Sequence, residues 1–224
     1  DLTLVERYVG SALDMERVPN AVAFAGVYPE VNDAIPHLGL SADGTPYVAH
    51  VVLTGNVPDA GVSRRIGGVW QSLGFANDPT STHLQRFTCP TLGVTAAGEP
   101  FVAMMAAAGR SGDSGLTQIV RRFNGSAWVT EREIVATSGN DRISLVMDGA
   151  NRPVIVWSGA VSGVGKRLNA ERFEGGIWQT LATRFGSLGG DVGDFRLAVR
   201  PDLTVALVTV SSTGPFGNAI HALT

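Results

Sequence analysis

The chain has 224 residues and 44% of them are hydrophobic, so it can bury a core and is not disordered throughout. Its 17 basic and 20 acidic residues give a formal charge of −3, which excludes the basic surface typical of nucleic-acid-binding domains. No apolar stretch reaches the ~18 residues of a membrane-spanning helix, so no transmembrane segment is expected. The single cysteine, Cys89, excludes an intrachain disulfide framework and a cysteine-based zinc site. No signal peptide is predicted at residue 1.

The predicted elements are short strands that recur along the chain. After a first hairpin at residues 1–16, four segments share a frame in which a leading Leu is followed eight residues later by Pro or Val. Each segment joins a short apolar strand, a turn and a second strand, mostly through turns that carry Gly, Asp or Asn, and therefore predicts a hairpin. The leading residues are Leu38, Leu92, Leu145 and Leu197, at steps of 54, 53 and 52 residues.

A second motif lies between these segments. It consists of Arg, an aromatic residue or Ile, a Gly-containing turn and Trp, and it also predicts a hairpin, because Gly adopts the positive φ of tight turns. We expect the tryptophans to pack between neighbouring repeats, where a large aromatic side chain buries most area. The motif runs from Arg65 to Trp70, from Arg122 to Trp128 and from Arg172 to Trp178, and Leu13 replaces Trp in the N-terminal instance that begins at Arg7.

Two hairpins per repeat give four antiparallel strands, A to D. With its Gly-x-Pro-Tyr/Phe-Val-Ala segment, seen at Gly44–Ala49, and its Arg-Phe-x-Gly-x-x-Trp segment, seen at Arg172–Trp178, the repeat resembles the β-propeller repeats of bacterial secreted and surface proteins with kelch- or sialidase-like blades. The resemblance implies an all-β propeller of four-stranded antiparallel blades of about 52–54 residues, in one domain over residues 1–224. The repeats lie near residues 36–73, 90–131, 143–181 and 195–224, with residues 1–16 as a C–D hairpin.

The chain starts and stops inside a blade, which leaves two interpretations of the ring. We expect the N-terminal strands to complete the C-terminal blade and to close four or five blades, because closure removes exposed strand edges. The alternative is a fragment of a larger propeller of about six to eight blades. Residues 3–9 and 218–224 both match strand C, which favours the alternative.

Binding residues are expected in the D–A and B–C loops, which vary between repeats and share one face of a propeller. If strand A is innermost, the polar residues that precede the leading Leu ring the channel entrance. A Gly-rich segment with Asp191 and Asp194 is a candidate site for Ca²⁺, and no other cofactor is indicated. The candidate ligand-binding residues are His37, Asp33, Asp78, His83, Arg110, Asp141, Arg142 and Arg196, with Thr91 and Ser144 completing the ring at the entrance.

No catalytic constellation is evident, so the sequence favours a non-catalytic module that recognises a protein or a glycan through this loop face. The resemblance implies an extracellular or cell-surface location, with the periplasm as a further compartment. Two alternatives stay open: a glycan-active hydrolase or lyase, and a structural component of an extracellular assembly. No nucleic-acid partner is expected, whereas a homo-oligomer is compatible with the sequence. The hydrolase would need carboxylates that converge at the channel mouth, for which the candidates are Glu30, Asp33, Asp78, Asp141, Asp191 and Asp194.

Overall fold

The computed structural model describes residues 4–9, 12–17, 36–54, 57–76, 90–107, 116–135, 142–161, 165–185, 192–199, 205–211 and 219–223. Side chains are described within residues 36–51, 59–76, 90–105, 117–134, 142–159, 166–183, 195 and 197–199. Every element in these ranges is a β-strand. None of the described residues belongs to a helix that is long and apolar enough to cross a membrane.

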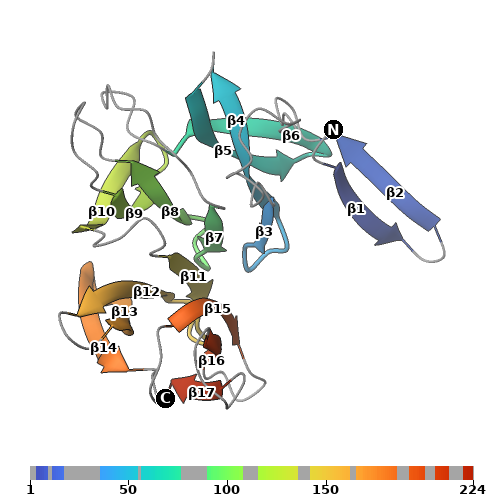
Figure 1. The fold of residues 1–224 in the computed structure, drawn as a ribbon. Helices are drawn as coiled ribbons and strands as arrows, with labels where there is room; N and C mark the ends of the chain where they lie inside the picture. Colours follow the sequence, from blue (N-terminus) through green and yellow to red (C-terminus); the bar gives the residue numbers. More distant parts are fainter. Residues whose placement is uncertain are drawn as a thin grey trace.

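The strands form five antiparallel sheets (Figure 1). Blade 1 consists of β3 (His37–Leu40), β4 (Pro46–Thr54), β5 (Val57–Ile66) and β6 (Val69–Phe75). Blade 2 consists of β7 (Thr91–Val94), β8 (Pro100–Ala107), β9 (Leu116–Phe123) and β10 (Trp128–Val135). Blade 3 consists of β11 (Ile143–Met147), β12 (Pro153–Val161), β13 (Gly165–Glu174) and β14 (Ile177–Phe185). Blade 4 has three described strands, β15 (Val192–Val199), β16 (Val205–Ser211) and β17 (Ala219–Leu223), and the N-terminal sheet has β1 (Leu4–Val9) and β2 (Ala12–Arg17).

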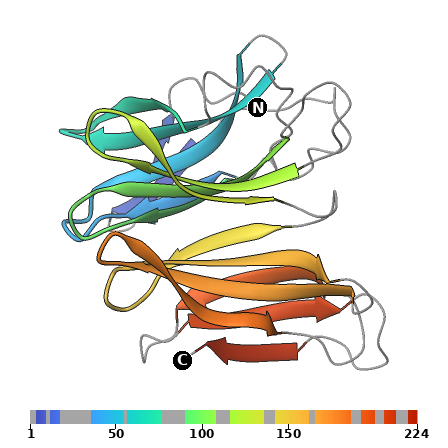
Figure 2. The same ribbon diagram turned by 90° about the vertical axis from the view of Figure 1, so that its left-hand side faces the viewer.

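The blades are arranged as in a propeller. The first strands of blades 1 to 4, β3, β7, β11 and β15, follow one another around a common centre, and the sheets extend outward from them (Figure 1). Seen from the side, the twisted sheets lie face to face (Figure 2). The predicted all-β propeller of four-stranded antiparallel blades is therefore confirmed.

In blades 1 to 3, the turn between the first two strands depends on one residue with a positive φ. Gly44 and Gly98 have φ of 81° and 80°, and Asn151 takes the same position in blade 3 with φ of 62°. Gly and Asn tolerate this left-handed conformation better than other residues. A proline then begins the next strand, where its missing N–H least disturbs the ladder.

The hairpin register corrects the sequence frame in blade 1. The two-residue turn at Gly67 and Gly68 pairs Ile66 with Val69, so Arg65 lies opposite Trp70. Consequently Arg64, which pairs with Tyr47, holds the position in blade 1 that Arg122 holds in blade 2 and Arg172 holds in blade 3. The sequence motif placed Arg65 there, one residue too late, because the hydrogen-bond register is set by the turn rather than by residue type.

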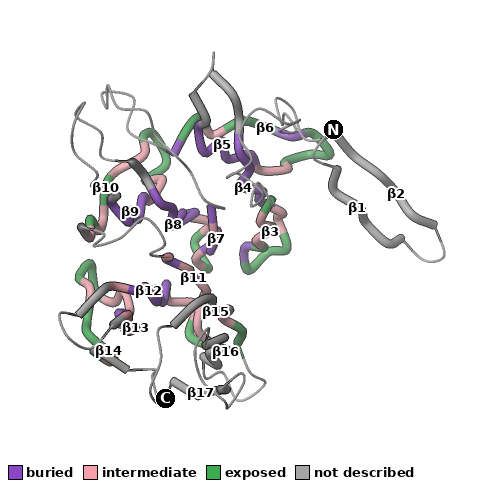
Figure 3. Tube along the Cα trace, viewed as in Figure 1, coloured by how far each residue is buried: buried purple, intermediate pink, exposed green. Residues whose placement is uncertain are grey.

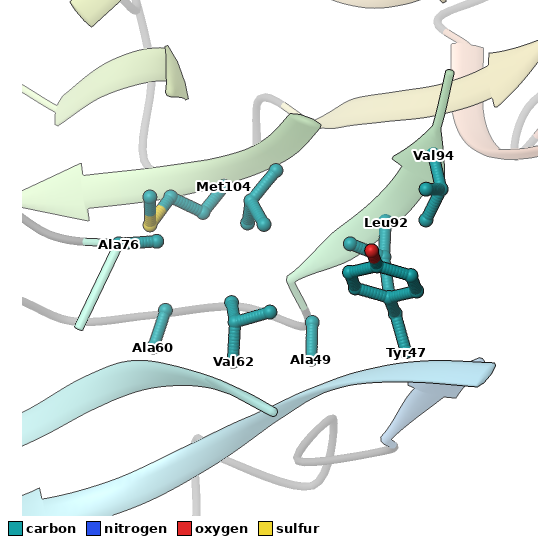
Figure 4. Close-up of a cluster of buried hydrophobic side chains, with 9 residues drawn as sticks. Tyr47, Ala49, Ala60, Val62, Ala76, Leu92, Val94 and Met104 are labelled. Carbon is teal, nitrogen blue, oxygen red and sulfur yellow. The ribbon is translucent and has the colours of Figure 1, made fainter. Parts of the chain in front are cut away.

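The core lies between blades (Figure 3). At the junction of blades 1 and 2, Tyr47 and Ala49 of β4 pack with Leu92 and Val94 of β7, and Val62 of β5 joins them (Figure 4). A second cluster joins blades 2 and 3 through Phe101, Ala103, Leu145 and Ile155, and a third joins blades 3 and 4 through Val156, Leu168 and Phe195.

Glycines in the middle of two inner strands allow this close packing. A Cβ at Gly93 would lie 2.5 Å from Leu145 Cδ2 and from Met147 Sδ, and one at Gly39 would lie 3.1 Å from Val94 Cγ2. The apolar side chains of one inner strand therefore lie directly on the backbone of the strand before it.

The first inner strand is the exception to this packing. Leu38 and Leu40 are 54% and 59% exposed, whereas Leu92 and Leu145, at the position of Leu38 in blades 2 and 3, are 3% and 0% exposed. Repeat-equivalent residues thus differ in burial because blades 2 and 3 pack against a preceding blade.

Candidate functional site

The inner strands begin at one end of the propeller. His37, the first residue of β3, contacts Leu92 near the start of β7, and Thr91, the first residue of β7, contacts Leu145 near the start of β11. These strands therefore run parallel across the blade junctions. This arrangement brings together the points where the long D–A connections join the blades, and it is the basis of the candidate site.

His37 is half-buried and bonds to the next blade. The backbone N–H of Leu92 donates to His37 Nδ1 over 3.2 Å. Burial lowers the pKa of the His37 imidazole below its ordinary value, because the cation is poorly solvated there. The neutral ring is thus the form that the fold favours, and the sequence-predicted ligand residue is engaged in packing between blades.

Thr91 makes the equivalent contact one blade further on. Its Oγ1 accepts a hydrogen bond from the Leu145 N–H over 3.0 Å and donates to the Ala103 carbonyl over 3.4 Å. The polar residues at this position, expected from sequence to ring the entrance, thus include two that tie neighbouring strands together. Ser144 is half-buried in β11, where it pairs with Val156.

Arg142 is held at the same end through its backbone. Its N–H donates to Ser158 Oγ over 2.8 Å, and the Ser158 N–H donates to the Arg142 carbonyl over 2.8 Å. Arg196 lies in β15 opposite Val208, and Asp194 lies opposite Val210. The remaining candidates lie outside the described residues: Glu30, Asp33, Asp78, His83, Arg110, Asp141 and Asp191.

Two polar residues of blade 1 lie in the interior. His50 in β4 and Asp59 in β5 are only 3% and 7% exposed, and their register places both on one face of blade 1. Burial lowers the pKa of His50. The sequence around Asp59 has no apolar alternation typical of a strand, whereas β5 already begins at Val57.

Lys166 lies near the start of β13, where it pairs with Ala160 of β12. The described residues contain no group of three or more His, Cys, Asp or Glu side chains that could hold a metal ion. The two aspartates proposed for Ca²⁺, Asp191 and Asp194, have no described side chains, so the calcium site stays a prediction.

Charged side chains also meet where the A–B and C–D turns join their strands. Arg152 bonds to Asp148 at 2.8 Å and to Glu174 at 2.7 Å. The Arg152 hydrogen bond lowers the pKa of Glu174. Arg122 bonds to Glu131 at 2.7 Å and to Glu99 at 3.3 Å. These ion pairs hold turns and neighbouring strands of the same blade together, so we assign them to the stability of the fold.

The repeated tryptophans join the outer strands. Trp128 Nε1 donates to the Leu73 carbonyl of blade 1 over 2.9 Å, and Trp178 Nε1 donates to the Glu131 carbonyl of blade 2 over 3.2 Å. The rings also pack on Phe123 and Phe173, with centroids 5.5 and 5.2 Å apart. The expectation that these side chains pack between blades is confirmed for both.

No protein-family model and no curated protein matches the sequence. Among solved structures, an α-L-arabinanase of Penicillium chrysogenum is similar with a TM-score of 0.60 at 10% identity, over 84% of this chain and 61% of that chain. The GH93 α-L-arabinofuranosidase of Fusarium graminearum has a TM-score of 0.56 at 12% identity, over 84% and 60%. A family 117 glycoside hydrolase of Zobellia galactanivorans has a TM-score of 0.51 at 10% identity, over 99% and 72%.

The chain thus spans about three fifths of the length of the first two structures, 61% and 60%. At these identities the likeness shows the propeller fold alone. It nevertheless corrects the main functional expectation: a non-catalytic binding module is wrong as the leading interpretation, because these similar propellers are glycoside hydrolases. The sequence reasoning missed this because it found no paired carboxylates in a recognisable motif.

Proposed function

We propose that the chain belongs to a propeller glycoside hydrolase that acts on arabinose-containing glycans. The observation that carries this proposal is the similarity, over 84% of the chain, to two propeller enzymes described as an α-L-arabinanase and an α-L-arabinofuranosidase. The activity is proposed for the whole protein, since the chain spans only part of the length of these enzymes. An extracellular location is part of the proposal, because polymeric glycans are met outside the cell.

The loop end of the blades is the proposed site of reaction. Glycoside hydrolysis commonly uses two carboxyl groups, a general acid that protonates the leaving oxygen and a second group that acts as base or nucleophile. The parallel starts of the inner strands support the proposal that the connections and the strand starts of different blades supply these groups. We propose that the reacting pair comes from Glu30, Asp33, Asp78, Asp141, Asp191 and Asp194.

The test measures the sugar released from linear arabinan and from 4-nitrophenyl α-L-arabinofuranoside, with xylan and galactan as reference substrates. We expect release from the arabinose substrates only. Single Asp→Asn and Glu→Gln changes at the six candidates should include two that lower kcat by ~10²–10⁴-fold, because each removes a proton donor, a base or a nucleophile. The stereochemistry of the released sugar would show whether the pair is closely or widely spaced.

A matched control is Asp43→Asn. Asp43 is exposed in the A–B turn of blade 1, where it accepts a hydrogen bond from the Thr45 N–H over 3.0 Å, and an amide oxygen can still accept that bond. This variant should keep full activity. A folded wild-type protein that releases no sugar from either arabinose substrate, or six candidate variants that all retain activity, would refute the proposal.

A further inference from the structure

One contact between blades 1 and 2 depends on an imidazole. His37 pairs with Ala49 in the sheet of blade 1, and its Nδ1 receives the Leu92 N–H across the junction at 3.2 Å. An imidazole nitrogen accepts a hydrogen bond only when it carries no proton. Protonation of His37 at Nδ1 therefore removes the acceptor and leaves two donors facing each other.

The next junction makes the same contact with a different group. The Leu145 N–H donates to Thr91 Oγ1 over 3.0 Å, and Leu145 holds the repeat position of Leu92. A threonine hydroxyl accepts at every pH at which proteins are folded. The Leu92 and Leu145 amides thus hold the same repeat position but bond to different acceptors. Of these two acceptors, only the His37 imidazole takes up a proton in the pH range of folded proteins.

The strands packed around His37 offer little to stabilise a cation. Neither β3 nor β7 carries another charged or titratable side chain, and β4 carries only Tyr47 and His50, neither of which supplies a negative charge between about pH 4.5 and 7.5. His50 pairs with Gly61 and adjoins Ala49 in the strand, so it lies on the opposite face of blade 1 from His37. Burial lowers the pKa of both histidines, in keeping with these apolar surroundings.

We propose that the His37–Leu92 contact is a proton-dependent link, which opens the loop end of the junction between blades 1 and 2 in acid while the junction between blades 2 and 3 stays closed. The proposal concerns the fold and does not depend on the activity proposed above. It assigns to His37 a role in acid response that Thr91, at the same repeat position, does not share.

The sign of the effect follows from the lowered pKa. The unfolded chain binds a proton at this residue at a higher pH than the folded chain does, so stability is greatest above the ordinary histidine pKa of about 6.5 and falls as the pH drops below it. The hydrogen bond itself opens once the pH falls through the lower pKa of the folded protein.

The test follows backbone hydrogen exchange by NMR at about pH 7.5 and at steps down to about pH 4.5, a range that spans histidine titration. The readout is the protection factor of the Leu92 amide divided by that of Leu145, which cancels general effects of pH. We expect this ratio to fall about fivefold to tenfold in acid, as for the loss of one hydrogen bond.

Three variants make the outcome specific. His37→Thr, which installs the residue of blade 2, should keep Leu92 protected and make the ratio independent of pH. Thr91→His keeps His37 and should extend the acid response to the Leu145 amide, so that the protection factors of both amides fall. His50→Met, which installs the residue found at Met104 of blade 2, should respond as the wild type does.

A constant ratio in the wild type, or an equal fall in His37→Thr, would overturn the proposal. Circular dichroism checks that each variant is folded. Should His37→Thr fail to fold, Thr91→His still decides the matter, because acid must then expose Leu145 if a histidine at this position is a proton-dependent acceptor.

Discussion

His37, Thr91, Trp128 and Trp178 are side chains that each reach from one blade to the next. Recurrence in the sequence was enough to predict where the tryptophans pack, because a large aromatic side chain at a fixed repeat position buries most area at the blade junction. It was not enough for His37, whose partner Leu92 lies 55 residues away. The Leu92 amide becomes a neighbour of His37 only when the inner strands pack together. Without that contact, a polar residue near a predicted channel suggests a ligand-binding role.

The indole N–H groups allow a direct measurement of these links. Trp128→Phe keeps an aromatic ring but leaves the Leu73 carbonyl without its donor, so we expect a loss of about 1–3 kcal/mol in the free energy of unfolding. Trp70→Phe is the control, since the buried Trp70 Nε1 has no hydrogen-bond partner within the described part of the chain. Urea denaturation of both variants gives the two values, and equal losses would show that ring packing alone is responsible.

At the scale of elements, turn chemistry was the most predictable feature. Gly44, Gly98 and Asn151 stand where a positive φ is required, and this preference is local, so the sequence reveals it. The ends of strands were less predictable. β4 extends to Thr54, β5 already begins at Val57, and Asp59 is buried in β5, because pairing with the neighbouring strand extends both strands beyond what their side chains suggest.

The left-handed position of the A–B turn yields a prediction at this scale. Gly44→Ala should destabilise the protein by about 1–2 kcal/mol, since a Cβ there meets no neighbouring atom within 4 Å and the penalty is conformational. Gly44→Asn, which copies Asn151 of blade 3, should cost clearly less. Thermal unfolding of the pair checks the expectation. If both variants lose the same stability, the turn does not require this conformation.

At the scale of the whole molecule, the repeat frame predicts the propeller and leaves undetermined which blade faces are covered. Leu38 and Leu92 are equivalent in sequence but differ in burial, because Leu92 packs against Tyr47 and Ala49 of blade 1. Which of the proposed carboxylates would react is unpredictable for a similar reason. Their roles depend on distances and burial between loops of different blades, and no local pattern records these.

The difference between these two leucines can be measured. Leu92→Ala should cost about 2–5 kcal/mol, because it opens a cavity beside Tyr47 and Val94. Leu38→Ala, at an exposed side chain, should change stability by no more than about 0.5 kcal/mol. Chemical denaturation of both variants provides the comparison. A large loss for Leu38→Ala would mean that another surface covers this side chain in solution.

The tryptophan links also have a direction. In each described case the donor lies on the later blade and the accepting carbonyl on the earlier one, at Leu73 and at Glu131, three positions after the tryptophan of that blade. A blade of this kind therefore carries a donor on one side and an acceptor on the other. Duplication of such a unit within the gene would generate a new junction that already has both partners, so chains of this type can lengthen by whole blades without inventing a new interface.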